Sequence, residues 1–401
     1  MNKDLDMARR IAEKVGDAGG RCYYVGGFVR DRLIGRDNKD VDIEVHGITP
    51  QKLAEILDDL GDRITMGASF GVYGLRHYDL DIAMPRSEKA VGRGHKDFEV
   101  TVDPFIGTEK AAQRRDFTIN AMMEDILTGE ILDHFGGRDD LRNGILRHVN
   151  DVSFGEDPLR VLRAAQFAAR FQFEVAEETV ELCSTMDLMA LAPERVFEEL
   201  KKAMLKADKP SVFFEVLRRM GQLGIWFPEV EHCDWERIMG QYDAAAAMKE
   251  KAREPLCFMF SALCVGLDMG LLLLSRLTNE RELTEYLIDM LMHLPTLHKL
   301  DGRDARQIEW NILYDHSLCP RDLLLLDAAL RGSAEIDPTA LRHLEAYEAL
   351  MQKPEVMGRD LIAAGLRPDR KFKELLTYAH ALHLEGVEKE EVLRRVLEQR
   401  R

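Results

Sequence analysis

Two aspartates that lie two residues apart are the first candidates for chemistry in this sequence. Asp40 and Asp42 begin a segment that alternates apolar and acidic residues to Val45, as a half-buried strand does, so both side chains project from one face. Two carboxylates about 6 Å apart repel by roughly 2–3 kcal/mol at an effective dielectric constant of about 20, and a divalent cation reverses that cost. Because all the ligands are oxygen atoms, the pattern predicts a Mg2+ site, although two acids facing solvent on an edge strand are the alternative.

A third carboxylate and a glycine turn extend this candidate site. Asp81 lies in a later strand-like stretch and could join the same metal ions, with Asp79 as the competing choice. Gly26 and Gly27 stand where a strand passes into a helix, which lets backbone N–H groups approach a polyphosphate closely. A plain tight turn is the alternative for the glycines alone, but the aspartates that follow them favour a metal-dependent phosphate site.

A second polar segment has the side chains that a nucleoside triphosphate requires. Arg114 and Arg115 carry guanidinium groups, which form charge-assisted bidentate contacts with phosphate oxygens. Asp116 and Asn120 can form hydrogen bonds with ribose hydroxyls. A surface salt-bridge cluster at the start of a helix is the alternative interpretation.

A third segment can read a nucleotide base. Pro158 suits the first turn of a helix, so Asp157 and Arg160, three residues apart, face the same way. The aspartate can accept a hydrogen bond from the amino group of cytosine, while the arginine donates to its ring nitrogen and carbonyl. A capping aspartate with an i, i+3 ion pair is the structural alternative. Arg163 continues the same helix face one turn further on.

The sequence predicts a small mixed α/β domain that carries the first two segments. Residues 3–17 have apolar positions at helical spacing and end at Gly19-Gly20, a helix stop signal. Alternation and apolar runs predict strands in the stretches 22–25, 41–45, 71–83 and 97–102. A short helix that ends at Leu33 follows the first of these strands. The first 150 residues or so therefore indicate a sheet with helices.

From Asp157 onward the sequence predicts long amphipathic helices. Leu, Ala, Glu, Lys and Arg dominate, and there is almost no β-rich run. Five prolines stand at predicted helix boundaries, namely Pro193, Pro228, Pro295, Pro320 and Pro354. Boundaries between helical domains are predicted near residues 205, 310 and 350. The predicted class is α+β, with a mixed-sheet head followed by an all-helical remainder.

Five segments in order resemble the nucleotidyltransferase branch that holds class II CCA-adding tRNA nucleotidyltransferases and bacterial poly(A) polymerases. They are GGFVRDRLIGRDNKDVDIEV (26–45), RRDFTINAM (114–122), DHFGGRDDLRNGIL (133–146), EDPLRVLRAAQFAARF (156–171) and PERVFEELKKAM (193–204). The resemblance implies a nucleotidyltransferase head at 1–140 and a helical neck that selects the base at 141–205. It further implies a helical body with a degenerate HD-like region at 206–310 and a tRNA-binding helical tail at 311–401.

The resemblance also implies an activity, namely template-independent addition of CCA from CTP and ATP to the 3′ end of tRNA, with release of pyrophosphate by a two-metal Mg2+ mechanism. The catalytic residues that it implies are Asp40, Asp42 and Asp81. The nucleotide-binding residues are Gly26, Gly27, Arg30, Arg114, Arg115, Asp116, Asn120, Asp157, Arg160 and Arg163. An A-adding enzyme acting on tRNA that ends in CC is one alternative, and a catalytically inactive RNA-binding scaffold is another.

Three further segments distinguish this chain from some relatives. The segment 84–103 corresponds to the family's flexible loop, and its full length argues against an enzyme that adds only CC. At 70–75, where poly(A) polymerases carry a Gly-Arg-Arg-Phe element, the chain reads FGVYGL, which favours tRNA as substrate. The stretch 262–268 lacks the His-Asp pair of a phosphohydrolase. His293 and His298 lack an obvious acidic partner at ligand spacing, so we expect packing or surface histidines.

Composition limits the possible partners. The net charge of −16 argues against a broad nucleic-acid footprint, so any RNA contact must be local. Arg367, Lys371 and Lys373 form a basic cluster that could meet tRNA phosphates, with a solvated helix start as the alternative. Six dispersed cysteines without CxxC spacing predict reduced thiols in the cytoplasm, and no apolar stretch is long enough for a membrane span. The sequence does not determine the oligomeric state.

Overall fold

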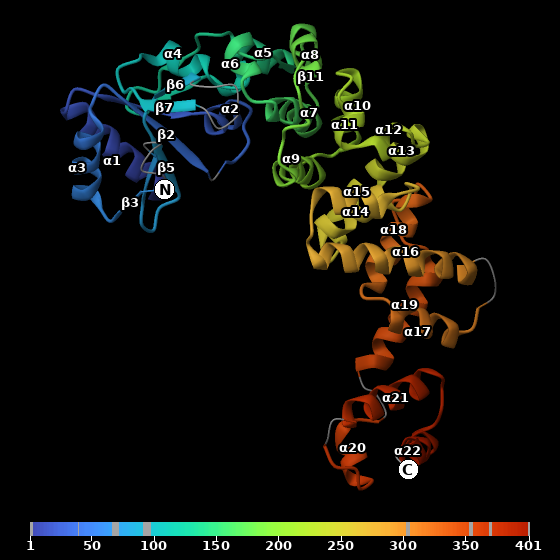
Figure 1. Ribbon diagram of the computed structural model, residues 1–401. Helices are drawn as coiled ribbons and strands as arrows, with labels where there is room; N and C mark the ends of the chain where they lie inside the picture. The colour runs from blue at the N-terminus through green and yellow to red at the C-terminus, as the bar shows by residue number, and fades with distance from the viewer. Residues whose placement is uncertain are drawn as a thin grey trace. The chain divides into compact units, whose positions relative to one another are not determined.

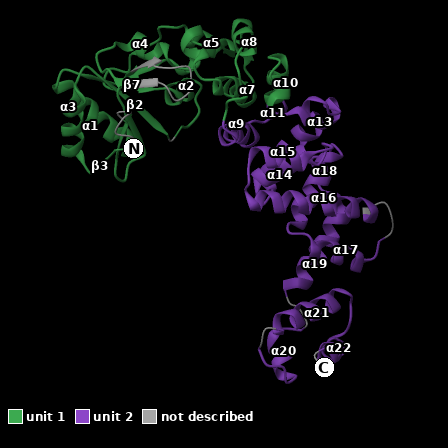
Figure 2. Ribbon diagram, in the orientation of Figure 1, with its two compact units in different colours: residues 1–191, 212–225 green, residues 192–211, 226–401 purple. Residues whose placement is uncertain are grey.

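The computed structural model describes residues 3–38, 40–65, 72–90, 98–301, 305–352, 356–368 and 371–399, with the side chains of 87–90 and 98–100 left aside. Two compact units make up the chain (Figure 2): Met1–Leu191 with Val212–Ile225, and Ala192–Ser211 with Trp226–Arg401. The predicted head, neck, body and tail form a finer division than these two units, and that division stays a prediction.

A seven-stranded sheet in the order β3-β4-β5-β2-β1-β8-β9 forms the base of the first unit (Figure 1). Its strands are β1 (Arg21–Val25), β2 (Val41–His46), β3 (Arg63–Thr65), β4 (Val72–Leu75), β5 (Leu80–Ala83), β8 (Met123–Asp125) and β9 (Ile131–Leu132). β2 pairs antiparallel with β1 and parallel with β5, after a crossover through α3 (Pro50–Leu60), β3 and β4. Both edges of β2 are therefore held by neighbouring strands.

Apolar periodicity explains how this sheet is covered. α1 (Lys3–Asp17) buries Met7, Ile11 and Val15 at helical spacing and packs against β1, β2 and α3. A separate cluster on the sheet contains Tyr23, Val25, Ala112, Ala121 and Met123. Because side chains alternate along a strand, the polar residues of β2 share one face, opposite its buried valines and isoleucine. These polar residues are Asp42, Glu44 and His46.

The remaining elements of the first unit are mostly short. They are α2 (Gly27–Leu33), β6 (Arg86–Ala90), β7 (Phe98–Val102), α4 (Thr108–Gln113), η1 (Thr118–Asn120), α5 (Gly137–Asn143), β10 (Ile145–Leu146), α6 (Asp151–Gly155), α7 (Leu159–Phe171), β11 (Glu174–Val175), α8 (Glu177–Ser184), α10 (Ser211–Arg219) and α11 (Leu223–Trp226). β6 and β7 form a separate hairpin, and β10 pairs in parallel with β11.

The second unit is helical in its described residues. Its helices are α9 (Pro193–Lys206), α12 (Pro228–Glu231), α13 (Trp235–Ala246), η2 (Lys249–Lys251), α14 (Pro255–Cys264), α15 (Gly270–Leu277), α16 (Arg281–Asp301), α17 (Gln307–His316), α18 (Pro320–Leu330), α19 (Pro338–Gln352), α20 (Gly358–Ala363), α21 (Phe372–Leu384) and α22 (Lys389–Gln399). α14 is buried from Cys257 to Cys264 and contacts α9, α13, α15, α16 and α18. A helix that is apolar on every side thus forms the centre of this unit.

The predicted α+β class is confirmed, while three local predictions need correction. The stretch 71–83 contains two strands, β4 and β5, because a turn with a positive φ at His77 separates them. The short strand β11 lies in a region that was predicted to be wholly helical. Pro295 lies inside α16 and not at a helix boundary, whereas Pro193, Pro228 and Pro320 begin helices as predicted. Pro354 lies outside the described residues.

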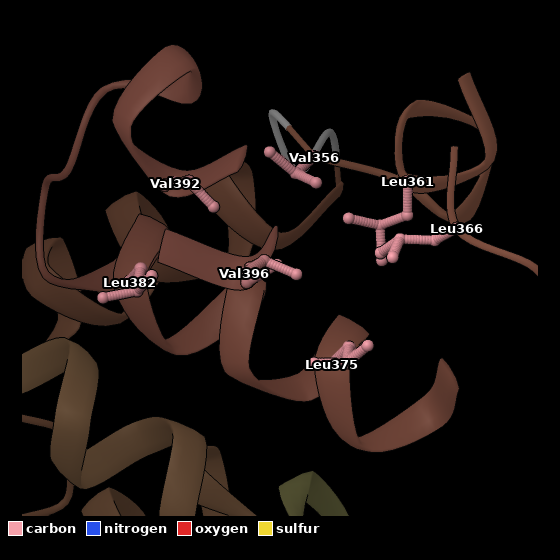
Figure 3. Close-up of a cluster of buried hydrophobic side chains, with 8 residues drawn as sticks. Val356, Leu361, Leu366, Leu375, Leu382, Val392 and Val396 are labelled. Atoms are coloured by element: carbon pink, nitrogen blue, oxygen red, sulfur yellow. The ribbon is translucent and has the colours of Figure 1, made fainter. Parts of the chain in front are cut away.

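The C-terminal helices α20, α21 and α22 share a small hydrophobic core (Figure 3). Its members include Val356, Leu361, Leu366, Leu375, Ala379, Leu382, Val392 and Val396. These side chains come from all three helices and the segments next to them, so the core holds the end of the chain together.

We predict that Leu361→Ala loosens α20–α22. Leu361 has no exposed surface, so truncation removes apolar contacts and leaves a cavity, at a cost of about 2–4 kcal/mol in local stability. Amide hydrogen exchange across 356–399 measures the change. The neighbouring Ile362 is 52% exposed and gives a matched control, because Ile362→Ala should change exchange little. Equal effects of the two substitutions would contradict the role of this core.

Candidate functional site

Parallel pairing of β2 with β5 brings two of the predicted carboxylates together. Asp42 and Asp81 are directly opposed in the register of these strands, so their side chains leave the same face of the sheet. Asp40 directly precedes β2 and is exposed. Asp79 instead lies before β5, and its backbone N–H donates to Asp4 (3.2 Å). The register therefore favours Asp81 over Asp79 as the third acid.

Like charges meet at Asp42. Burial, together with the negative charges of Asp81 and Asp40, raises the pKa of its carboxyl from 3.8 to about 6, although Arg115 opposes this shift. Ionised carboxylates in this position repel each other, and a divalent cation relieves that repulsion. No group of three or more His, Cys, Asp or Glu among the described side chains is arranged to hold a metal ion on its own. Mg2+ usually takes one or two carboxylates and completes its shell with phosphate oxygens and water, so these acids fit that ion.

Gly26 lies close to the side chains of Arg115 and Asp42. Its φ of 67° lies in the left-handed region, and a Cβ placed there would lie 3.2 Å from Nη1 of Arg115 and 3.7 Å from Oδ2 of Asp42. A Cβ on Gly27 would lie 3.3 Å from Nη2 of Arg30. The glycine turn thus leaves open the space beside Asp42, with an arginine on its border.

The two consecutive arginines have different surroundings. Nη2 of Arg115 donates to Oε2 of Glu44 (3.1 Å), whose Oε1 is 2.8 Å from Nε2 of His46. Burial raises the pKa of Glu44, but His46 and Arg115 more than offset it, so the net shift is downward. Arg114 turns elsewhere, because its guanidinium donates to the backbone carbonyl of Arg86. Of the predicted pair, Arg115 is therefore the one beside Asp42.

Asp116 and Asn120 form hydrogen bonds within the protein. Oδ1 of Asp116 accepts from the backbone of Phe117 (2.8 Å) and from Nδ2 of Asn120 (2.9 Å), while Nε of Arg163 donates to Oδ2 (2.8 Å). Burial raises the pKa of Asp116, but these partners lower it by more. Nη1 of Arg30 donates to Oδ1 of Asn120 (2.5 Å). The sequence identified these residues but gave no sign of their mutual hydrogen bonds.

The arginine of the base-reading pair connects α7 to the preceding segments. Nη1 of Arg160 donates to the carbonyl of Ser153 (2.7 Å) and Nη2 to that of Arg114 (2.8 Å). Asp157 accepts the backbone N–H of Leu159 (3.1 Å), the first residue of α7. Each Nη carries a second N–H, which leaves Arg160 donors for a ligand.

Three side chains that the sequence analysis passed over belong to this site. Glu44 and His46 follow Asp42 at a spacing of two, so their position on the same face was readable from the alternation. Asn38 bridges Asp31 (2.9 Å) and the backbone N–H of Asp40 (3.0 Å), which only the folded loop reveals. Two parts of the segments compared with relatives lie outside the described residues. They are Phe70-Gly71 of the stretch 70–75 and Gly92–Lys96 of the loop segment 84–103.

His293 is half-buried and His298 is exposed, in line with the predicted packing or surface histidines, but the expected lack of acidic partners is wrong. Nδ1 of His293 lies 3.0 Å from Asp289, and Nε2 of His298 lies 2.8 Å from Asp327, so each has an acidic partner. Arg276 of α15 donates to Glu229 (2.8 Å) and to the carbonyl of Trp226 (3.0 Å). These contacts join helices of the second unit.

The predicted RNA-contacting residues are accessible. Arg367, Lys371 and Lys373 are exposed, in the segment between α20 and α21 and at the start of α21. Among the helices of the described residues, none has both the length and the apolar character that crossing a membrane requires.

Family models match two stretches of the chain. Residues 22–147 match the model described as "Poly A polymerase head domain", and residues 172–233 match "Probable RNA and SrmB- binding site of polymerase A". The multifunctional CCA protein of Nitrosococcus oceani is 46% identical over 213 residues, which are 52% of this chain and 50% of that protein. That of Haemophilus ducreyi is 37% identical over 275 residues, 63% of this chain and 65% of that protein. The chain thus spans about half to two thirds of these relatives' length.

Solved structures agree with the fold. A CCA-adding enzyme in complex with ATP has a TM-score of 0.72 at 22% identity and covers 98% of this chain and 92% of its own. A Thermotoga maritima CCA-adding enzyme with tRNA has a TM-score of 0.68 at 22% identity, covering 99% of this chain and 95% of its own. The first unit thus contains a sheet domain that matches a poly(A) polymerase head, and the second unit is helical in its described residues.

Over the matched residues the chain is similar to tRNA nucleotidyltransferases and poly(A) polymerases, the same family that the five sequence segments resemble. Members of this family generally use divalent metal ions. The relatives carry the name of CCA proteins, and the structural neighbours are CCA-adding enzymes.

We predict that Asp42→Asn stabilises the metal-free protein at neutral pH. The folded-state pKa of about 6 lies above the ordinary 3.8, so the free energy of unfolding falls as the pH rises between these values and is level above them. Removing the charge of Asp42 should therefore raise the free energy of unfolding by about 1–2 kcal/mol above pH 7 and change it little near pH 4. Thermal unfolding with a chelator at both pH values measures the difference.

Asp79→Asn is the matched control for this prediction, since Asp79 is exposed and lies two residues from Asp81. Equal stabilisation by both substitutions would mean that only the total negative charge is relieved, which contradicts a specific carboxylate cluster. Adding Mg2+ should stabilise the unaltered protein more than Asp42→Asn.

Proposed function

We propose that this protein adds CCA to the 3′ end of tRNA, using CTP and ATP and releasing pyrophosphate, as a Mg2+-dependent nucleotidyltransferase. The observation that supports it most is the register of Asp42 opposite Asp81, beside the open turn at Gly26. Burial, and then repulsion from Asp81, raises the pKa of Asp42, so the ionised carboxylate is costly unless a cation and a polyphosphate complete the site. The named relatives, which are CCA proteins, support the same reaction.

The residues of the head divide the work of phosphoryl transfer. Asp40 and Asp42 would hold Mg2+, which when bound neutralises the triphosphate and favours the ionised 3′-hydroxyl. Asp81 adds negative charge beside them. Arg115, held by Glu44, is placed to contact phosphate oxygens through its guanidinium fork. Catalysis then rests on positioning and charge neutralisation as the hydroxyl attacks the α-phosphate and pyrophosphate leaves.

Base selection falls to α7 in this proposal. Arg160 is fixed by two backbone carbonyls, so its remaining N–H groups point in a defined direction. Asp157 at the start of α7 supplies the acceptor that pairs with an exocyclic amino group. Arg163, with Asp116, buttresses the same helix against the head. Side chains would thus take the place of a template strand.

The tRNA would contact this acidic protein at local basic positions. Arg367, Lys371 and Lys373 are exposed candidates, and with a net charge of −16 the binding should be modest and sensitive to salt. A cytoplasmic location fits the six free cysteines, four of which are buried thiols.

Incubation with labelled CTP or ATP and three tRNAs tests the reaction. The tRNAs end at the discriminator base, at C or at CC. If the protein adds CCA, all three should be extended to a product that ends in CCA. Extension only of the CC-ending tRNA by ATP would identify an A-adding enzyme. Binding of tRNA without any extension would identify an inactive scaffold.

We predict that Asp40→Ala lowers nucleotide incorporation by roughly a thousandfold or more, because a metal ligand is lost. Folding and tRNA binding should stay near normal, as measured by thermal unfolding and filter binding. Asp37→Ala is the control, since Asp37 is an exposed aspartate of the same loop. Full incorporation by Asp40→Ala would refute the metal assignment.

We predict that Arg160→Ala weakens base choice. Loss of a bidentate base contact should reduce the preference of CTP over UTP by about 10- to 100-fold, measured as the ratio of kcat/KM values. Arg142→Ala, which removes an exposed arginine paired with Asp139, should leave that ratio unchanged. An unaltered ratio in Arg160→Ala would remove this residue from base selection.

A further inference from the structure

We propose that Asn38 is a positioning residue that ties the metal-binding Asp40 to a buried polar relay ending at Arg163 of α7. This inference rests on the proposed function, since it concerns how the same site is held. Asn38 is not among the metal-binding and phosphate-binding positions predicted in the segment 26–45, which are Gly26, Gly27, Arg30, Asp40 and Asp42. The relay runs through Arg163, Asp116, Asn120, Arg30, Asp31, Asn38 and Asp40.

Asn38 uses both ends of its amide. Nδ2 donates to Oδ2 of Asp31 (2.9 Å), and Oδ1 accepts from the backbone N–H of Asp40 (3.0 Å). The pairing of β2 with β5 begins only at Val41, so the ladder does not hold the residue before it. Asn38 thus supplies the hydrogen bond that fixes the backbone of Asp40.

The other end of this bridge is rigid. Asp31 is 2% exposed, and its Oδ1 accepts from Nε of Arg30 (2.7 Å), while Nη2 of Arg170 lies 3.7 Å from Oδ2. A buried carboxylate between two guanidinium groups is costly to displace, because each charge would lose its partner in a poorly solvated place. Asn38 is therefore bound to a fixed point in the fold.

From that point the relay continues to α7. Nη1 of Arg30 donates to Asn120 (2.5 Å), which donates to Asp116 (2.9 Å), which accepts from Nε of Arg163 (2.8 Å). The guanidinium carbons of Arg30 and Arg163 each lie 5.2 Å from the centre of the Phe167 ring. Every step joins one donor to one acceptor, so the path contains no conflict of polarity.

The consequence is a link between base reading and metal binding. A nucleotide that fits against α7 leaves Arg163 in place and keeps Asp40 in position for the cation. A misfitted base that displaces Arg163 disturbs the partners that hold Asp40. Groups that orient a metal ligand affect the affinity of the site as strongly as many ligands do. Selection would then act on the chemical step as well as on nucleotide binding.

Metal affinity measured without nucleotide or tRNA tests the role of Asn38. Mn2+ binding to the full chain is followed by electron paramagnetic resonance, and the Mg2+ concentration for half-maximal incorporation is measured separately. Asn38→Ala should weaken Mn2+ binding and raise that Mg2+ concentration by roughly 10-fold. Asp187→Ala is the matched control, since Asp187 accepts a backbone N–H two residues on (Met189, 2.9 Å) away from the relay. Equal Mn2+ affinity in both variants would overturn the proposal.

Two further variants separate the relay from a local turn. Asn38→Ser keeps an acceptor for the N–H of Asp40 but is too short to reach Asp31, so it should still weaken Mn2+ binding. Arg163→Ala should also weaken Mn2+ binding, and less than additively with Asn38→Ala. Full Mn2+ affinity in Asn38→Ser or Arg163→Ala would overturn the relay, while thermal unfolding checks that each variant folds. If the unaltered protein bound no Mn2+, the metal site of the proposed function would be refuted. If only the variants lose Mn2+ binding, the positioning role of Asn38 is supported.

Discussion

Repulsion between carboxylates on two adjacent parallel strands is the constraint around which the first unit is arranged. Asp42 and Glu44 lie on one face of β2, yet their environments differ. Burial raises the pKa of both groups, but Arg115 and His46 bring that of Glu44 below its usual value, while Asp81 and Asp40 leave that of Asp42 at about 6. The charge of the Glu44 carboxylate is therefore balanced by side chains of the fold, whereas the carboxylate of Asp42 has too little positive charge around it. That difference separates a structural acid from one suited to a cation.

Arginines packed on aromatic rings connect this acidic face to α7. Phe167 contacts the guanidinium groups of Arg30 and Arg163, and Phe171 contacts those of Arg30 and Arg170. A guanidinium group is weakly hydrated and planar, so it can pack on a ring while its edge donates hydrogen bonds. Arg163 and the other partners of the buried Asp116 lower the pKa of that carboxyl, so it can stay ionised next to an apolar helix face. The segments proposed to bind metal, phosphate and base are thereby connected within the first unit.

The second unit uses its buried acids differently. Asp322 accepts the backbone N–H of Arg253 (3.1 Å) and the hydroxyl of Tyr286 (2.6 Å). Asp289 accepts from Ser317 (2.9 Å) and the backbone of Leu318 (3.0 Å). Each carboxylate has donors supplied by neighbouring helices, so it adds specificity to the packing and needs no ion. The features that favour a cation are concentrated in the first unit.

Local patterns were sufficient to predict much of this protein. Alternation placed Asp42 on a strand, the glycines marked the turn before α2, and helical spacing predicted α1 and the amphipathic helices, because these signals depend on neighbours along the chain. The choice between Asp81 and Asp79, the separate directions of Arg114 and Arg115, and the partner of His298 depended on tertiary structure. Each is set by strand register or by a contact between segments far apart in sequence. Residue spacing determines which way a side chain leaves its own element, and only folding determines what lies opposite it.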